Sequence, residues 1–282
     1  MNNRVLNLRR VLFSFFVLYG ACHVSAADAR KPSEPLAKAD QFARDSADVK
    51  ALIAEVVAAN GGIEAYRALK SISYKYTYRS ADKKEDVSQE TYLIAGEKSL
   101  GTYTKRDRVS PNIKGKLVQI YDGVSTRVKV DGKEISDPVA IKMADFLRKT
   151  NFYWFAMMFK LSDPGLHYEL LKPSEGKPTR HHRVKVTFSD QVGDAQDTYT
   201  LYINKKTKLV DQFLFTVMDF GKSEPQMMEV SYKKVGNLML PVQRRYTASD
   251  WDGNISKKNA TRWNVEIMEN VLLNVPTPDA LK

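Results

Sequence analysis

The sequence holds few residues whose types and spacing would support catalysis or metal binding. Beyond residue 26 its histidines are His167, His181 and His182, and none belongs to an H-E-x-x-H motif or a Cys/His cluster. Because neighbouring residues of a strand point to opposite faces, His181 and His182 are poorly placed to share one metal ion. No G-x-S-x-G nucleophile motif occurs. We therefore expect no catalytic residue, no metal site and no cofactor.

Two acidic segments look like ion-binding loops only superficially. Asp190, Asp194 and Asp197 lie in a glycine-containing loop, which we interpret as an acidic turn and not as a calcium site. In residues 250–254 the glycine falls at the wrong spacing for a calcium loop, so a hairpin turn is the better interpretation. Pairs of catalytic carboxylates are made in space, and a sequence does not show them. A secreted hydrolase therefore stays open as a third alternative.

The first 26 residues have the pattern of an export signal. Arginines precede a short apolar run at residues 11–18, and residues 24–26 form a cleavage site for a signal peptidase. The apolar run is too short to span a bilayer. Tyr19-Gly20-Ala21-Cys22 also resembles a bacterial lipobox, in which Cys22 would carry a lipid. We expect a periplasmic or secreted protein, with a membrane-anchored lipoprotein through Cys22 as the alternative.

Charge and cysteine content restrict the partners and the source of stability. The formal net charge is +11, and losing Arg4, Arg9 and Arg10 with the signal, and no acidic residue, leaves +8. A basic exported protein favours anionic partners such as a membrane surface or an envelope protein, and export makes nucleic acid an unlikely partner. Cys22 is the only cysteine, so stability must come from a hydrophobic core and not from disulfides.

The most apolar stretch of the chain lies in the middle, where residues 152–159 are apolar or aromatic at every position. Asp137 before Pro138 predicts a helix start, and Asp163-Pro164-Gly165 predicts its end. Ahead of Asn151 we expect an apolar stripe of Val139, Met143 and Phe146, with Arg148 off it. The run from residue 152 must be covered by other parts of the chain. It forms either a plain core helix or the lining of a cavity.

Residues 71–80 begin a long series of predicted strands. Ile72, Tyr74, Tyr76 and Tyr78 alternate with polar residues, as in a sheet that has one covered face. Similar segments continue to residue 270 and are separated by turn residues such as Asp122-Gly123. We expect an α+β, mostly β fold: a curled antiparallel half-barrel of about eleven strands, with helices at about residues 39–69 and 138–161 covering the concave face. Residues 27–38 are predicted to be a flexible tether, and residues 39–282 a single domain.

The order of these segments is similar to that of a known family. Residues 59–72 (ANGGIEAYRALKSI), Tyr121-Asp122-Gly123, residues 201–209 (LYINKKTKL) and the closing segment from Trp263 to Pro276 resemble the periplasmic lipoprotein carrier and receptor superfamily, the LolA/LolB-like proteins, and in particular an uncharacterised secreted branch. The resemblance covers about residues 45–280 and implies a half-barrel with a cavity for acyl chains under its helices. The bulky run at residues 152–159 departs from that pattern, because side chains of this size can fill the cavity instead of lining it.

The leading interpretation is an exported, non-enzymatic, monomeric carrier or binding protein for a lipid, a lipoprotein acyl chain or another hydrophobic ligand. The alternative is an envelope scaffold or interaction protein with a filled core and a basic binding surface. The residues predicted to line the cavity are Tyr74, Tyr76, Tyr78, Phe152, Trp154, Phe155, Met157, Met158 and Phe159. The tyrosines would offer ring surface to the ligand and hydroxyls to a polar headgroup.

Overall fold

The computed structural model describes residues 34–172, 180–190, 192 and 196–282. The predicted export signal, Cys22 and Asp194 lie outside the described residues. The chain divides into one unit of Met1–Asp40 and a second of Gln41–Lys282. The second unit holds the sheet and the helices that pack against it, and the candidate site lies within it.

Three helices and a long series of strands make up the described chain. The helices are α1 (Glu34–Ala59), α2 (Ile63–Ala68) and α3 (Pro138–Lys160). The strands are β1 (Ser71–Arg79), β2 (Glu85–Leu93), β3 (Lys98–Arg106), β4 (Leu117–Tyr121), β5 (Thr126–Val130), β6 (Lys133–Glu134), β7 (Leu166–Leu171), β8 (His181–Phe188), β9 (Tyr199–Asn204), β10 (Val210–Val217), β11 (Lys222–Val235), β12 (Leu238–Ala248) and β13 (Asn264–Leu273). Short 3-10 turns include η2 (Met218–Phe220).

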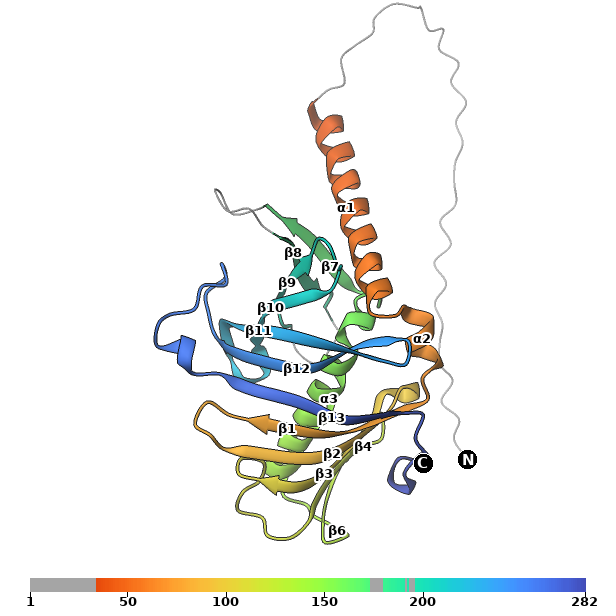
Figure 1. The fold of residues 1–282 in the computed structure, drawn as a ribbon, viewed down its shortest axis with the longest axis vertical. Helices are drawn as coiled ribbons and strands as arrows, with labels where there is room; N and C mark the ends of the chain where they lie inside the picture. Colours follow the sequence, from red (N-terminus) through yellow and green to blue (C-terminus); the bar gives the residue numbers. More distant parts are fainter. Residues whose placement is uncertain (1–33, 173–179, 191, 193–195) are drawn as a thin grey trace, which may run out of the picture. The chain divides into compact units, whose positions relative to one another are not determined.

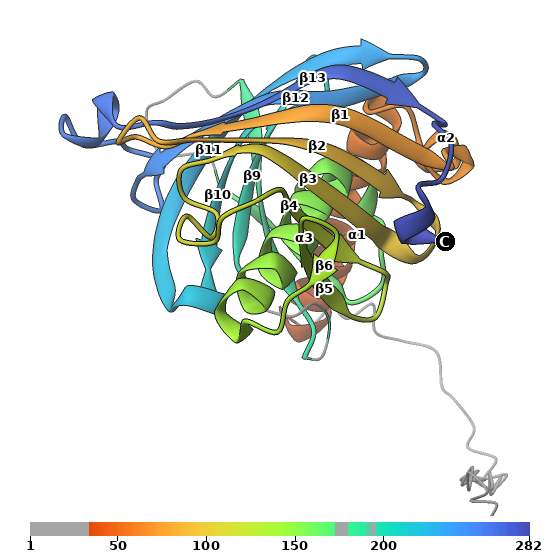
Figure 2. The ribbon, with the colours of Figure 1, turned by 90° about the horizontal axis from the view of Figure 1, so that it is seen from below.

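All the strands belong to one antiparallel sheet. Its order is β6-β5-β4-β3-β2-β1-β13-β12-β11-β10-β9-β8-β7, so β6 and β7 are its two edges and the sheet is not closed into a barrel. Strands that follow one another in sequence are neighbours, except β6 and β7, which lie at opposite edges, and the middle of the sheet is closed by the pairing of β1 with β13. Figure 2 shows the sheet curled over α3. The predicted half-barrel is therefore confirmed, with β6 as a short strand that the sequence pattern did not predict.

The helices cover the concave face of this sheet. Helix α3 runs across the concave face beneath the central strands (Figures 1 and 2). The C-terminal part of α1, residues 49–57, packs its valines, Leu52 and Ile53 against α3 and strands β8–β11. Helix α2 contributes Tyr66 to the core between α3 and the strands β1 and β2. No helix among the described residues is long and apolar enough to span a bilayer.

The start of α3 agrees with the sequence prediction. The Asp137 carboxylate accepts hydrogen bonds from the backbone N–H groups of Val139 and Ala140, both at 2.9 Å. Pro138 takes the first helical position, where its missing N–H is not needed. The carboxylate thus satisfies two of the donors that a helix leaves unpaired at its N-terminus.

The face that α3 buries ahead of Asn151 differs from the prediction. Val139 is 76% exposed and Met143 is also exposed, whereas Ala140, Ala144 and Arg148 are buried. The small alanines let the helix approach strands β3–β5 closely, and Arg148 is accepted in the interior because it has an acidic partner there. Ile141 and Leu147 also pack on this face, so side-chain volume and charge pairing, together with hydrophobicity, decide which face is buried.

Helix α1 begins at Glu34, ahead of the start predicted near residue 39. Glu34, Ala37 and Lys38 are good helix formers, and proline is tolerated in a first turn, so Pro35 does not delay the helix. The last residues of the predicted tether, 34–38, are therefore helical.

Candidate functional site

The apolar residues of α3 point to two sides of the concave interior. Phe152, Phe155 and Phe159 pack with β1, β2, β12 and β13, and each is at most 2% exposed. Met157 and Met158 pack on the other side, with α1 and strands β8–β11. Five of the predicted lining residues thus lie inside the core, distributed around the helix.

The aromatic side of this interior is organised by ring contacts. Phe159 stacks on Tyr66 of α2 with ring centres 4.6 Å apart and planes within 7° of parallel. Tyr92 of β2 contacts Phe152 at 5.4 Å and Phe155 at 5.7 Å. Such pairs add to the free energy of burial beyond their area. They fix the C-terminal half of α3 on the sheet.

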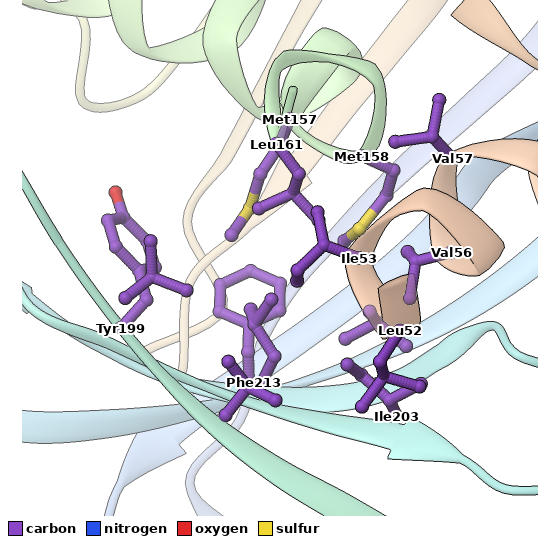
Figure 3. Close-up of a cluster of buried hydrophobic side chains, with 14 of the residues drawn as sticks. Leu52, Ile53, Val56, Val57, Met157, Met158, Leu161, Tyr199, Ile203 and Phe213 are labelled. Atoms are coloured by element: carbon purple, nitrogen blue, oxygen red, sulfur yellow. The ribbon is translucent and has the colours of Figure 1, made fainter. Parts of the chain in front are cut away.

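The other side of the interior is aliphatic. Figure 3 shows side chains of α1, of α3 and of the strands meeting in one cluster. The labelled side chains are Leu52, Ile53, Val56 and Val57 of α1, Met157 and Met158 of α3, Leu161 at the C-cap of α3, and Tyr199, Ile203 and Phe213 of β9 and β10. Unbranched methionines adapt their shape to their neighbours at little cost. This side is the more adaptable of the two.

Tyrosine hydroxyls lie within the aromatic side of this interior. The Tyr74 hydroxyl donates a hydrogen bond to the Tyr92 hydroxyl at 2.8 Å, and both tyrosines are buried. Burial raises the pKa of each phenol, so both hydroxyls stay protonated. Tyr76 is buried nearby, at 7% exposure. Two of the three predicted lining tyrosines therefore lie in the interior with their hydroxyls.

A buried ion pair joins α3 to the sheet. Arg148 and Glu90 both have fully buried side chains, and the guanidinium donates to both oxygens of the carboxylate, with Nη2 to Oε1 at 3.1 Å. Burial acts to lower the pKa of Arg148, but the Glu90 charge raises it above the ordinary value. A Cβ atom at Gly101 of β3 would collide with this guanidinium. Glycine is thus required where Arg148 crosses the strand.

A second buried ion pair lies on β12 and β13. Arg244 and Glu266 face each other in register, with Nη2 2.7 Å from Oε2, and their side chains are 2% and 3% exposed. The Arg244 guanidinium also lies over the Trp154 ring of α3, 5.5 Å from its centre. Burial raises the pKa of Glu266, although the Arg244 charge acts to lower it.

Aromatic residues lie next to this pair, of which Tyr78, Trp154 and Tyr246 are half-buried and Phe215 is buried. The hydroxyls of Tyr78 and Tyr246 are 2.8 Å apart, and the exposed Arg108 lies over the Tyr78 ring at 4.5 Å. Trp154 contacts Tyr246 and also Phe215 of β10, with ring centres 5.2 Å apart in the second case. We call Tyr78, Trp154, Phe215 and Tyr246 the aromatic border. Through Trp154 it contacts the guanidinium of the buried ion pair.

Sequence reasoning missed the charged half of this site. Glu90, Arg148, Arg244 and Glu266 were not among the predicted residues, yet all four are buried. A usable signal existed in the strands: Arg244 is in phase with the buried Leu240, and Glu266 with the buried Met268. Charged residues of opposite sign in phase with the apolar face of two strands indicate a pair inside the sheet's curve.

Comparisons with known proteins show a common fold. No protein-family model and no curated protein matches the sequence. A DUF1329 family protein from Desulfovibrio piger matches in structure with a TM-score of 0.52 and 12% sequence identity, over 83% of this chain and 97% of that one. The chain is therefore a curled half-barrel protein, and the fold predicted from the LolA/LolB-like resemblance is confirmed.

Two further solved structures are similar at lower scores. A LolA superfamily protein from Nitrosomonas europaea matches with a TM-score of 0.47 and 13% identity, over 79% of this chain and 94% of that one. A domain described as that of an outer membrane lipoprotein-sorting protein from Vibrio parahaemolyticus matches with a TM-score of 0.39 and 11% identity, over 74% and 87% of the two chains. At such identities a structural likeness concerns the fold and not the function.

Proposed function

We propose that the protein is an exported, non-enzymatic carrier or binding protein for a lipid, a lipoprotein acyl chain or another hydrophobic ligand. The ligand lies between the concave face of the sheet and α3. The observation that carries the proposal is the aromatic border: beside α3, the apolar interior of an open sheet reaches the surface through half-buried rings. The sequence resemblance to lipoprotein carriers and receptors supports the same class.

The apolar surface near that border supports an entry point. Phe146 of α3 contacts Phe220 of the η2 turn with ring centres 4.7 Å apart, and Met143 lies one helical turn before Phe146 on α3. Met143, Met218 and Phe220 are exposed by 36%, 42% and 47%. Exposed apolar side chains gathered at one place are typical of binding sites. An acyl chain would pass this apolar surface and reach Trp154.

Energetics favour binding only if side chains give way to the ligand. Burial contributes about 0.8 kcal/mol for each CH2 group, so a fatty acyl chain gains on the order of 10 kcal/mol before the costs of binding. The phenylalanines of α3 already fill their own side of the core. We therefore propose that the chain enters on the methionine side, where Met157 and Met158 can change rotamer, and shifts α3 slightly. Of the predicted lining residues, Trp154, Met157 and Met158 then border the ligand, and the phenylalanines stay packed on the other side of α3.

We propose that the carrier acts outside the cytoplasm, in the periplasm or as a secreted protein, because residues 1–26 have the pattern of an export signal. Mass spectrometry of the mature N-terminus decides between the two processed forms. A chain that starts at residue 27 without modification indicates simple secretion. A chain that starts at a lipid-modified Cys22 indicates a membrane anchor.

The dense packing of the interior supports a second candidate, an envelope scaffold. Phe152, Phe155 and Phe159 are buried and contact one another or Tyr92. A solid core would leave binding to the basic exterior, whose net charge of +8 after signal removal favours anionic envelope partners. Binding of such a partner would weaken with salt and involve no lipid.

Native mass spectrometry of the full chain purified from the cell envelope tests the carrier proposal. We expect a bound species of lipid mass, and uptake of a fluorescent fatty acid by the delipidated protein. Trp154→Ala should weaken that uptake by about tenfold, a loss of roughly 1.4 kcal/mol. Trp263→Ala is the matched control, since Trp263 packs with Tyr202 and Met227 on the opposite face of the sheet. Protein that is repeatedly ligand-free and takes up no fatty acid would exclude a carrier.

A further inference from the structure

The two buried ion pairs differ in how well their hydrogen-bond donors are used. Arg148 directs Nη1 and Nη2 at the two oxygens of Glu90. Arg244 approaches Glu266 at one oxygen, without the geometry of a hydrogen bond, and its Nε and Nη1 have no hydrogen-bond partner among the described residues. Buried donors without acceptors cost free energy. Arg244 is thus a buried cation with free donors on its guanidinium.

The surroundings of Arg244 suit an amphiphile. One face of the guanidinium lies over Trp154, which is half-buried and contacts Phe215 and Tyr246. The hydroxyl pair of Tyr78 and Tyr246 adds polar groups next to this apolar surface. A buried cation with unused donors, beside half-buried aromatic rings, is complementary to an oxyanion that carries an apolar tail.

We propose that Arg244 binds the oxyanion headgroup, a carboxylate or a phosphate, of an amphiphilic ligand whose tail lies against Trp154 and the methionine side of the core. This inference rests on the proposed carrier function and makes it more specific. Arg244 Nε and Nη1 donate to the headgroup, and the Tyr78 and Tyr246 hydroxyls lie at its outer side. The exposed Arg108, over the Tyr78 ring, attracts the anion to the border.

Glu266 explains how the buried charge of Arg244 is tolerated when no ligand is bound. Its carboxylate neutralises Arg244, which would otherwise be an unpaired buried charge. An incoming anion competes with this carboxylate for the guanidinium, so removing the negative charge of Glu266 should strengthen anion binding. In the Arg148–Glu90 pair both terminal nitrogens already donate to the carboxylate and only Nε lacks a partner, so this pair has no such role and fixes α3 on the sheet.

The experiment compares three ligands with the same tail: lauric acid, dodecyl phosphate and dodecanol. Their affinities for the delipidated full chain are measured by displacement of a fluorescent fatty acid. We expect the two acids to bind about tenfold more tightly than the alcohol. Equal affinities of all three would overturn the headgroup proposal and leave the carrier function intact, whereas no binding of any of them would overturn the carrier function itself.

Variants test whether Arg244 causes the preference for the two acids over dodecanol. Arg244→Met combined with Glu266→Gln removes both charges and should abolish the preference for acids while dodecanol still binds. Glu266→Gln alone should increase the affinity for both acids. Arg148→Met combined with Glu90→Gln is the matched control and should keep the wild-type preference. A preference that survives the Arg244 double variant, with a native circular dichroism spectrum, would refute the assignment.

Competition by small anions distinguishes a site for an amphiphile's headgroup from a site that binds any anion. Inorganic phosphate and acetate, at the concentrations that saturate the amphiphiles, should not displace the probe because they lack a tail. Displacement by inorganic phosphate as effective as that by dodecyl phosphate would show that the tail contributes nothing, and this result would also overturn the proposal.

Discussion

Replacing Arg148 with methionine should lower the free energy of unfolding by about 3–5 kcal/mol, because the substitution leaves Glu90 buried without its cation. Both side chains are fully buried and share two hydrogen bonds. Typical domains are stable by about 5–15 kcal/mol, so the variant should fold with a much reduced margin. Arg148→Met with Glu90→Leu replaces both charges by apolar groups and should recover most of the loss.

Urea unfolding at pH 7, followed by circular dichroism and tryptophan fluorescence, measures these differences. The matched control is Lys75→Met, which removes an exposed pair with Glu269 at 3.1 Å and should cost less than about 1 kcal/mol. Salt should not change the difference between wild type and Arg148→Met, since a buried pair is screened little. A cost for Arg148→Met as small as that of Lys75→Met would refute the reasoning.

Gly101 provides an independent check of the same geometry. Gly101→Ala places a methyl group against the Arg148 guanidinium and should destabilise the wild-type protein. In the Arg148→Met background, a flexible thioether replaces the planar guanidinium, and the same substitution should cost less. The two substitutions should therefore be strongly non-additive. Additive costs would mean that Arg148 does not lie over the glycine.

Further predictions concern the ends and the core of the helices and the pH dependence of stability. Asp137→Ala removes the N-cap of α3 and should lower the unfolding free energy by about 1 kcal/mol, whereas Asp137→Asn should cost less; equal costs would contradict the capping role. Phe159→Ala should cost about 3–5 kcal/mol, measured by urea unfolding, because it empties the site stacked on Tyr66. Burial, with help from Lys205, lowers the pKa of His182 below its usual value of 6.5. The folded protein thus prefers neutral His182, and its stability should be complete above pH 6.5 and fall as the pH drops through that value, a slope that His182→Gln should reduce in thermal melts at pH 5–7.

Much of the fold was predictable because local sequence patterns specify most of its strands, helix ends and turns. The alternation of Ile72, Tyr74 and Tyr76 specified β1, and all three are buried. Asp137 and Pro138 specified the start of α3 to the residue. Turn residues such as Gly236-Asn237 separated β11 from β12. The two-residue β6 was not predictable, because so short a segment has no period of its own.

The candidate site was predictable only in its apolar half. Phe152, Trp154 and Met157 were indicated by the absence of any polar neighbour in their run. Arg148 and Arg244 were not, because an isolated charged residue is usually solvated and nothing local shows its partner. Glu90 lies 58 residues from Arg148 in sequence. Only the paired strands and the crossing helix bring such residues together.

The position of β13 in the sheet has a consequence for how the chain folds. The centre of the sheet is the pairing of β1 with β13, whose Lys75 and Glu269 are 194 residues apart in sequence. Every other pair of neighbouring strands is close in sequence and can form as a local hairpin. The pairing of β1 with β13, in contrast, closes a loop that contains nearly all the other strands. Such distant contacts slow the search for the native state. We therefore expect the two halves of the sheet, β1–β6 and β7–β13, to form first and the pairing of β1 with β13 to form late in folding.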